Sequence, residues 1–200
     1  SQCIRMDTYP YAEDEFLHNW SCAIMNEYPN FNIVGEEWTT NPVITSSWQK
    51  DSKLNKDGCL PSVMDFPLQA AIANATKDQN GLDRLFELLG NDHLYGDVNN
   101  LVVFADNHDM NRLAFQVDNE VNRIKMSLAL IYALRGIPQV YYGTELLYSH
   151  TKNGDHGQIR KDFAFDWPNA YELTLTFDQI QVTQYLRMLN AYRKLHPALQ

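Results

Sequence analysis

Short apolar runs alternate with longer stretches of helical periodicity along this chain. The apolar runs predict strands at residues 3–6, 31–35, 62–66, 101–105 and 138–143. Apolar residues three and four positions apart predict helices at residues 13–27, 67–75, 83–90, 120–136 and 178–196. Gly136 is expected at the C′ position of the fourth helix, and Pro197 directly follows the last. Strands interleaved with helices indicate an α/β chain with a parallel sheet or barrel.

Acidic residues follow three of the predicted strands. Asp7 comes after the first strand, Glu36 and Glu37 come after the second, and Asp109 lies shortly after the fourth. In parallel folds the carboxyl ends of the strands meet at one edge, and that edge carries the chemistry. A plain polar turn would also explain Asp109 taken alone. Three acidic strand ends together predict the mouth of a pocket.

The composition narrows the range of partners. The 200 residues carry a net charge of −9, which argues against a nucleic acid or an anionic membrane surface as partner. No apolar stretch has the length of a membrane span. The size fits one domain with a sizeable core. The 11 Tyr, 9 Phe and 4 Trp residues exceed what such a core needs, and their side chains can stack on sugars.

The three cysteines are Cys3, Cys22 and Cys59. Their number is odd, they lie far apart, and none forms a C-x-x-C pair. The sequence therefore predicts neither a disulfide framework nor a zinc site. Cys22 falls on the apolar side of the helix predicted at residues 13–27, where we expect a buried thiol.

Two carboxyl groups that flank a glycosidic bond can hydrolyse it, one as the proton donor and the other as the nucleophile. Arg5 and Asp7 share one face of their strand, so the guanidinium should lower the pKa of Asp7, as a nucleophile requires. Neighbouring carboxylates and partial burial should raise the pKa of Glu36, as an acid requires. A structural Arg5–Asp7 ion pair that lines a barrel is the alternative interpretation.

Several segments also resemble a known family. The segments IRMD, VGEEW and FADNHD, in this order and spacing, are similar to the second, third and fourth sequence blocks of the α-amylase family of glycoside hydrolases, glycoside hydrolase family 13. The segments RGIPQVYYGTEL and YRKLHPAL resemble the eighth strand and the closing helix of that family. The resemblance is greatest to the neopullulanase and cyclomaltodextrinase branch. It implies a partial TIM (β/α)₈ barrel, approximately strands 4 to 8 with their helices.

The resemblance implies a catalytic role for three carboxyl groups. Asp7 would be the nucleophile, Glu36 the acid/base, and Asp109 the third carboxylate, which grips sugar hydroxyls and distorts the ring. Arg5 and His108 would orient the nucleophile and bind the sugar at the cleaved position. The mechanism would be retaining, with the catalytic carboxyl groups about 5–5.5 Å apart.

Further residues are candidates for substrate binding. Asn107 belongs to the polar cluster after the fourth strand, and Trp38 would be a stacking platform on the leaving-group side or a rim residue packed on a loop. Asp155 and Arg160 occupy the loop where relatives bind the next sugar, with a spacing one residue longer than the common pattern. Glu37, which should point to the other side of its strand, is the alternative acid.

The resemblance also implies that residues 1–200 are the C-terminal portion of a catalytic barrel. Strands one to three, the inserted lobe and the C-terminal β domain of the family have no counterpart in this chain, and a whole barrel needs about 250 residues. The exposed sheet edges would favour self-association or pairing with the missing barrel half. We therefore expect poor starch hydrolysis by the isolated chain.

The expected activity is retaining hydrolysis of α-glucosidic bonds in starch, maltodextrins or related α-glucans. A transglycosylase of the same family and a non-catalytic carbohydrate-binding fragment are the alternatives, and the linkage cleaved stays open. A metal-dependent hydrolase that uses Asp106, His108, Asp109 and His156 is a further alternative, without a recognised metal-ligand spacing.

The expected chemistry requires no cofactor and no catalytic metal. Whether the protein binds a structural calcium ion stays open, because Gln2-Cys3 and Pro10-Tyr11 replace the family's usual Asp-Gly and Lys-His. The segment SQCIRMD resembles the interior of a domain and shows no signal peptide. The location of the protein stays open, with the periplasm or the exterior of a bacterium as candidates for the parent enzyme.

Overall fold

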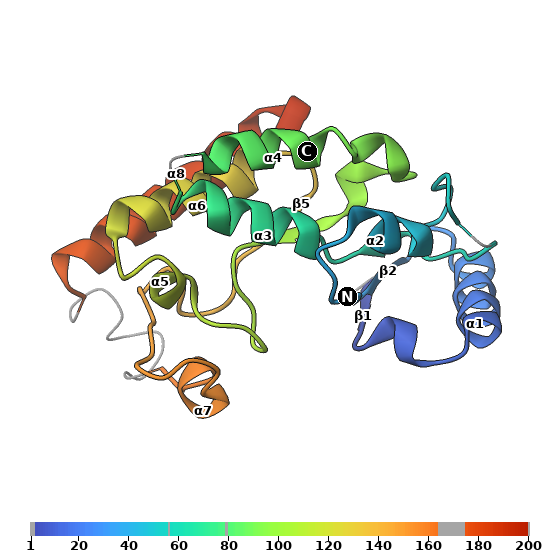
Figure 1. Ribbon diagram of the computed structural model, residues 1–200, viewed down its shortest axis with the longest axis horizontal. Coiled ribbons are helices and arrows are strands. Elements are labelled where there is room, and N and C mark those ends of the chain that lie inside the picture. Colours follow the sequence, from blue (N-terminus) through green and yellow to red (C-terminus); the bar gives the residue numbers. More distant parts are fainter. Residues whose placement is uncertain (1–2, 56, 79, 164–174, 200) are drawn as a thin grey trace.

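The computed structural model describes residues 3–55, 57–78, 80–163 and 175–199 (Figure 1). The strands are β1 (Cys3–Met6), β2 (Asn32–Gly35), β3 (Ser62–Val63), β4 (Val102–Phe104) and β5 (Ile137–Gln139). The α-helices are α1 (Asp14–Glu27), α2 (Pro42–Trp48), α3 (Phe66–Ala75), α4 (Gly81–Leu89), α5 (Leu113–Gln116), α6 (Val121–Ala133), α7 (His156–Ile159) and α8 (Phe177–Leu195). Short 3₁₀ turns lie at η1 (Tyr9–Tyr11), η2 (Asp92–Leu94), η3 (Val98–Asn100) and η4 (Pro197–Leu199).

All strand pairs that the structure describes are parallel. One sheet has the order β1-β2-β3, a second has the order β4-β5, and a parallel bridge between Met64 and Val102 connects them. The strands therefore follow one another in space in the same order as along the chain. This arrangement confirms the predicted parallel α/β fold, a partial TIM barrel. It also brings the carboxyl ends of the strands to one edge.

The third and fifth predicted strands are much shorter in the structure than the sequence suggests. The third ends at Val63, because the Asp65 carboxylate accepts a hydrogen bond from the Leu68 amide at 2.9 Å and caps α3. Phe66 thus begins a helix instead of ending a strand. The fifth strand ends at Gln139, several residues before the end of the predicted segment.

Helix α2 was not predicted. Its sequence, PVITSSW, contains β-branched residues and serines that favour other conformations. The start signals are nevertheless present, because the Asn41 side chain accepts a hydrogen bond from the Val43 amide at 3.0 Å and Pro42 occupies the first turn. These two residues could have revealed the helix.

The helices α3, α4, α6 and α8 lie side by side and cover one face of β4 (Figure 1). Their apolar faces form the largest hydrophobic cluster, which includes Ile72, Leu85, Val103, Leu128 and Val182. A second cluster packs α1 against β2 and β3, with Leu17 and Ile33 at its centre. No helix of the described part is long and apolar enough to cross a membrane.

The predicted C′ role of Gly136 is wrong. Helix α6 ends with Leu134 as its C-cap, and Gly136 lies two residues further on with a φ of 98°. A Cβ atom at this position would lie 2.7 Å from the carbonyl oxygen of Leu101. Glycine is needed because the turn into β5 passes close to the backbone before β4, in a conformation that other residues rarely adopt.

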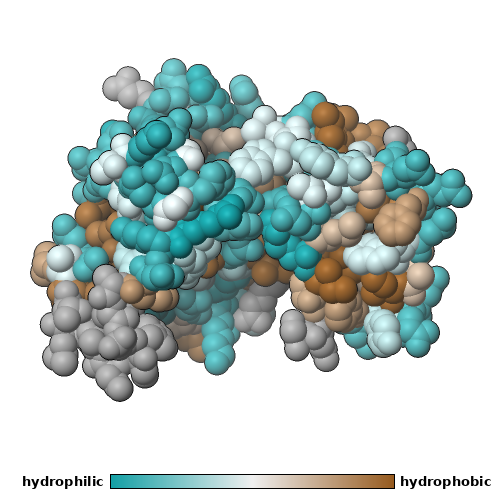
Figure 2. Space-filling view, turned by 90° about the horizontal axis from the view of Figure 1, so that it is seen from below, coloured by the Kyte–Doolittle hydropathy of each residue, from teal (hydrophilic) through white to brown (hydrophobic). Residues whose placement is uncertain are grey.

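The two outer strands have open edges. Within the described residues β1 pairs only with β2, and β5 pairs only with β4. In the space-filling view, hydrophobic side chains concentrate at the right-hand end, the end that holds β1 and β2, and hydrophilic residues are more frequent at the left (Figure 2). An unpaired edge beside exposed apolar surface is a common site of association.

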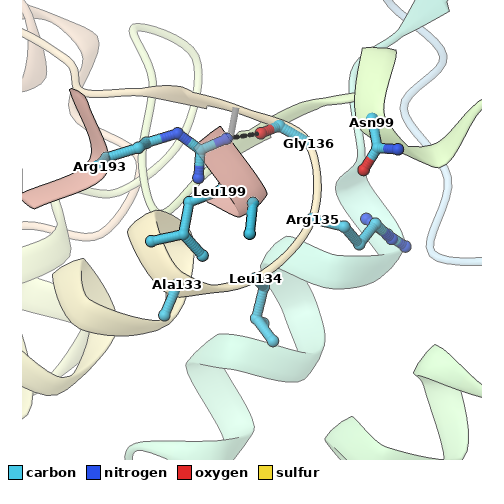
Figure 3. Close-up of a pocket in the computed structure, with 8 residues that line it drawn as sticks. Asn99, Ala133, Leu134, Arg135, Gly136, Arg193 and Leu199 are labelled. Carbon is cyan, nitrogen blue, oxygen red and sulfur yellow. Dashed lines mark hydrogen bonds between the residues drawn. The ribbon is translucent and has the colours of Figure 1, made fainter. Parts of the chain in front are cut away.

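A small pocket opens at the amino ends of β4 and β5 (Figure 3). It is lined by Asn99, Ala133, Leu134, Arg135, Gly136, Arg193, Ala198 and Leu199. The Arg193 guanidinium donates hydrogen bonds to the carbonyl oxygens of Tyr132 at 2.8 Å and Gly136 at 2.5 Å. The pocket thus lies at the strand ends opposite to the acidic residues.

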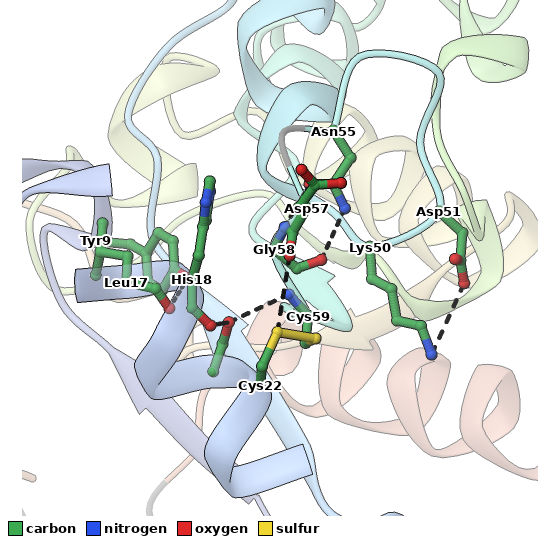
Figure 4. The surroundings of a disulfide bond; sticks show 11 residues. Tyr9, Leu17, His18, Cys22, Lys50, Asp51, Asn55, Asp57, Gly58 and Cys59 are labelled. Atoms are coloured by element: carbon green, nitrogen blue, oxygen red, sulfur yellow. Dashed lines mark hydrogen bonds and ion pairs between the residues drawn. A yellow bond between two sulfur atoms is a disulfide. The ribbon is translucent and has the colours of Figure 1, made fainter. Parts of the chain in front are cut away.

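A disulfide bond joins Cys22 in α1 to Cys59 in the loop before β3 (Figure 4). The predictions of an absent disulfide framework and of a buried Cys22 thiol are therefore wrong. The two cysteines lie 37 positions apart in the sequence, and spacing alone gave no sign that the fold packs the loop against α1. Cys3, the free cysteine of the described residues, is exposed on β1.

Candidate active site

Asp7 and Glu36 are neighbours at the carboxyl ends of β1 and β2. The register pairs Met6 with Gly35, so the next residue of each strand, Asp7 and Glu36, stands beside the other. The Asp7 side chain is 62% exposed, whereas that of Glu36 is 4% exposed. One carboxyl group is therefore open to solvent, and the other lies behind it in the protein.

Arg5 contacts both carboxyl groups. Its Nη2 lies 2.5 Å from Oε1 of Glu36, and its Nη1 lies 3.6 Å from Oδ2 of Asp7. The predicted Arg5–Asp7 pairing is therefore present, and the contact with Glu36 is the shorter one. A single guanidinium thus fixes the two carboxyl groups relative to each other.

The backbone after β1 also holds Glu36 in place. The Thr8 amide donates to Oε2 of Glu36 at 3.1 Å, and the Tyr9 amide donates to the Glu36 carbonyl oxygen at 3.0 Å. Thr8 has a φ of 45°, a left-handed conformation that is uncommon for a residue other than glycine. Strain of this kind persists where the surrounding contacts impose it, here where an amide must face a carboxylate.

The local environment shifts the two pKa values in opposite directions. Burial raises the pKa of Glu36, and its hydrogen bond with Asp7 acts in the same direction, against the Thr8 amide and Arg5. The hydrogen bond with Glu36 lowers the pKa of Asp7, helped by the charges of Arg5 and His108 and opposed by burial. Between the two shifted values Glu36 keeps its proton and Asp7 is ionised.

Glu37 is held away from this pair. Its Oε2 accepts a hydrogen bond from the indole nitrogen of Trp48 at 2.7 Å, and burial raises its pKa. Trp38 stacks on Phe66, with ring centroids 5.0 Å apart and an interplanar angle of 21°. The Trp38 side chain nevertheless remains 52% exposed, so it packs on the core and also presents surface to the solvent.

Asp109 and His108 form a second cluster with Arg160. Nε2 of His108 lies 3.0 Å from Oδ2 of Asp109. Arg160 pairs through Nη2 with Oδ1 of Asp109, and its Nε donates to the His108 carbonyl oxygen at 2.8 Å. The structure thus joins three of the candidate residues, from loops 51 positions apart. This cluster follows β4, and the Asp7–Glu36 pair follows β1 and β2, so both lie at carboxyl ends of the parallel strands.

Asn107 and Asp155 shape the loops that carry these groups. Oδ1 of Asn107 accepts hydrogen bonds from the amides of Asp109 at 2.9 Å and Met110 at 3.1 Å. Asp155 caps α7, with Oδ1 accepting from the Gln158 amide at 3.2 Å. The structure therefore gives both side chains a role in the backbone, and their predicted contacts with substrate stay predictions.

Asp106 is fully enclosed behind the second cluster. Its carboxylate accepts hydrogen bonds from the Leu113 amide at 2.8 Å and from the Thr144 hydroxyl at 3.0 Å. Burial raises the pKa of Asp106 to about 6. Among the residues that the structure describes, no three His, Cys, Asp or Glu side chains are grouped so that they could hold a metal ion.

Comparison with known proteins gives a family model and relatives that agree with one another. Residues 4–185 match the family model described as the catalytic domain of alpha-amylase. A cyclomaltodextrin glucanotransferase of Bacillus licheniformis is 30% identical over 191 residues, 94% of this chain and 24% of the relative. An alpha-amylase of Niallia circulans is 32% identical over 167 residues, 81% of this chain and 30% of the relative. The chain thus spans about a quarter of the first relative's length.

The fold is also that of solved amylases. The crystal structure of an alpha-amylase from Geobacillus thermoleovorans, complexed with acarbose, superposes with a TM-score of 0.78 at 24% identity. The match covers 99% of this chain and 41% of that chain. At this identity the likeness shows the fold, which is the barrel that the family resemblance implies and one of the two folds that the strand and helix pattern allows.

Proposed function

The chain belongs to the alpha-amylase catalytic-domain family, and on that premise we propose that it supplies the catalytic carboxyl groups for retaining cleavage of α-glucosidic bonds. Starch, maltodextrins and related α-glucans are the proposed substrates. The observation that carries this proposal is the adjacency of Asp7 and Glu36 at two paired strand ends, both in contact with Arg5, and the opposite directions of their pKa shifts support it. Retaining glycosidases need such a division between two adjacent carboxyl groups.

In the first step Asp7 attacks the anomeric carbon of the bound glucosyl unit, and Glu36 donates its proton to the departing oxygen. The C–O bond to the leaving group breaks as the bond to Asp7 forms, which gives a glycosyl-enzyme. Glu36, now ionised, then takes a proton from water, whose oxygen displaces Asp7 from the sugar. Both steps are completed by side chains of this chain and require no cofactor.

The second cluster has a binding role in this proposal. The Asp109 carboxylate, held by His108 and Arg160, is fixed where it can accept hydrogen bonds from sugar hydroxyls. Such contacts position the ring for attack and strengthen as the transition state forms. The exposed part of Trp38 supplies an aromatic surface for a neighbouring sugar.

Transglycosylation is the second candidate function. Several of the relatives are cyclomaltodextrin glucanotransferases, including the relative that is 30% identical over 94% of this chain. The same glycosyl-enzyme serves both reactions, because a sugar hydroxyl can replace water as the acceptor. Hydrolysis and transglycosylation differ only in whether water or a sugar hydroxyl group attacks the glycosyl-enzyme.

Covalent trapping tests the proposal without multiple turnovers. We would incubate the 200-residue chain with 5-fluoro-α-maltosyl fluoride, whose activated leaving group departs without acid assistance, and locate the added mass by peptide mass spectrometry. The expected result is one maltosyl adduct on Asp7. Asp7→Asn should abolish the adduct, whereas Glu36→Gln should still form it, because the fluoride needs no proton donor.

Two results of the trapping experiment would contradict the proposal. A folded wild-type chain that gains no adduct, or gains it on another residue, excludes Asp7 as the nucleophile of this chain. Circular dichroism of each variant provides the test of folding. Products released in the presence of maltose then separate hydrolysis from transfer, since transfer gives longer oligosaccharides.

A further inference from the structure

Arg112 is the largest fully buried side chain in the described part of the chain. Its Nε donates a hydrogen bond to the carbonyl oxygen of Ile159 at 2.7 Å, and its Nη1 donates to that of Tyr142 at 2.5 Å. Arg112 itself follows β4, whereas both acceptors lie in the segment after β5. One side chain therefore fastens two loops of the site edge together.

These contacts complete a closed ring around the second cluster. Ile159, whose carbonyl Arg112 holds, directly precedes Arg160 in the sequence. Arg160 reaches back to Asp109, three residues before Arg112. The ring runs from Asp109 along the chain to Arg112, across to Ile159, and returns through Arg160. A displacement at Arg112 must therefore change the geometry of the Arg160–Asp109 pair.

Arg112 also supports an aromatic ring at the end of β5. Its guanidinium carbon lies 4.1 Å from the centroid of the Tyr141 ring, within the range of a cation–π contact. The Tyr141 ring lies 6.4 Å from that of His108, centroid to centroid. Arg112 thus contacts Tyr141, whose ring lies near His108. It also holds the backbone beside Arg160, which pairs with Asp109.

Stability alone does not account for this arginine. Within the described residues no ion pair involves Arg112, and its Nη2 is buried without a hydrogen-bond partner. The charge of Arg112 is compensated by the nearby carboxyl groups of Asp106 and Glu145 and by the rings of Tyr141 and Tyr142, but a buried apolar side chain of similar volume would need no such compensation. What an apolar side chain could not do is hold two carbonyl groups in a fixed geometry.

We propose that Arg112 is a positioning residue that fixes Arg160 against Asp109 and thereby sets the geometry of the sugar-binding cluster. The inference rests on the function proposed above in so far as that cluster binds α-glucan. The contacts that define the ring stand independently of that function, and they can be measured without it.

The experiment compares Arg112→Lys with a matched control, Arg193→Lys. Arg193 also donates to two backbone carbonyl groups, but it lies at the opposite strand ends (Figure 3). Lysine keeps the charge at either position and loses the two-pronged geometry. Arginine Nε–H signals in ¹⁵N NMR spectra report Arg160 directly, because its Nε–H donates to the His108 carbonyl.

Arg112→Lys should shift the Arg160 Nε–H signal and slow the trapping of Asp7 by about 10- to 100-fold, as a misplacement on the order of 1 Å does. Arg193→Lys should leave both readouts within about 2-fold, whatever its effect on stability. A folded Arg112→Lys variant with an unchanged Arg160 signal would overturn the inference. So would equal effects of the two substitutions on trapping.

A second measurement covers the case in which Arg112→Lys does not fold. In the wild-type chain, the Nε–H chemical shifts of Arg112 and Arg160 should change at the same temperature on heating, because the two residues belong to one ring. A change of the Arg160 chemical shift at a temperature where that of Arg112 is unaltered would exclude the proposed role. A wild-type chain that fails to trap the maltosyl group contradicts the proposed function, whereas the arginine signals still decide the role of Arg112.

Discussion

The Arg5 guanidinium bridges the buried carboxyl group of Glu36 and the exposed carboxylate of Asp7, whose pKa values are shifted in opposite directions. Burial raises the pKa of Glu36, and the neighbouring Glu36 carboxyl group lowers the pKa of Asp7. The separation of the two pKa values depends on the register that places the two strand ends side by side. The first prediction follows from this separation.

The rate should show a bell-shaped dependence on pH. Activity requires ionised Asp7, whose pKa is lowered from 3.8, and protonated Glu36, whose pKa is raised from 4.5. The rate should therefore rise through a value below 3.8 and fall through a value above 4.5. Glu36→Gln should remove the fall at high pH and lower kcat/KM by about 10²–10⁴-fold for substrates with poor leaving groups. Initial rates with aryl maltosides of graded leaving-group pKa provide the measurement.

The disulfide should contribute substantially to stability. It closes a loop of 37 positions, and cross-links of this span stabilise by about 3–4 kcal/mol through the unfolded state. The double variant Cys22→Ser/Cys59→Ser should lower the free energy of unfolding in urea by that amount. Cys3→Ser is the control, because Cys3 is free and exposed. Equal urea midpoints for the wild-type chain with and without reductant would contradict the prediction.

Asp106 should make stability depend on pH in an unusual direction. Its pKa in the folded chain is about 6, above the ordinary value of 3.8, so the folded state binds more protons between these two values. The free energy of unfolding should therefore fall as the pH rises from about 4 to 6, by about 2 kcal/mol. Asp106→Asn should flatten this slope, and the exposed Asp83→Asn should leave it unchanged. Urea titrations at several pH values measure both.

The open edge of β1 should promote self-association of the isolated chain. Among the described residues β1 has a strand on one side only, and Cys3 on it is exposed. Lysine on an edge strand discourages pairing with another chain. Cys3→Lys should therefore lower the sedimentation coefficient measured at high concentration, whereas Cys3→Ser should not. A wild-type chain that sediments as a monomer at every concentration would show that this edge does not pair.

The sequence was informative wherever a periodic pattern decides the structure. The strands around Ile4 and Ile33 are marked by apolar runs, and parallel pairing then requires the acidic residues after them to converge. The Arg5–Asp7 proximity follows from the two-residue period of a strand. These predictions needed only the local apolar patterns and the rule that the carboxyl ends of parallel strands meet at one edge.

Other features depend on loops, where no period operates. The Cys22–Cys59 bond and the Arg160–Asp109 pair form between segments whose approach is set by the packed fold. The role of Arg112 is hidden for the same reason, because a lone arginine after a polar turn reads as a surface residue. Only the three-dimensional structure shows that its side chain is enclosed.

The bridge that Arg5 forms between Asp7 and Glu36 has an electrostatic consequence for ligand entry. With Glu36 protonated, the formal charges of Arg5 and Asp7 cancel, and those of Arg160 and Asp109 cancel as well. These two groups of residues therefore add no net charge to the site, although the chain as a whole carries a charge of −9. A neutral sugar gains nothing from long-range attraction, so its association should be insensitive to ionic strength. Recognition is then left to short-range hydrogen bonds and aromatic contact.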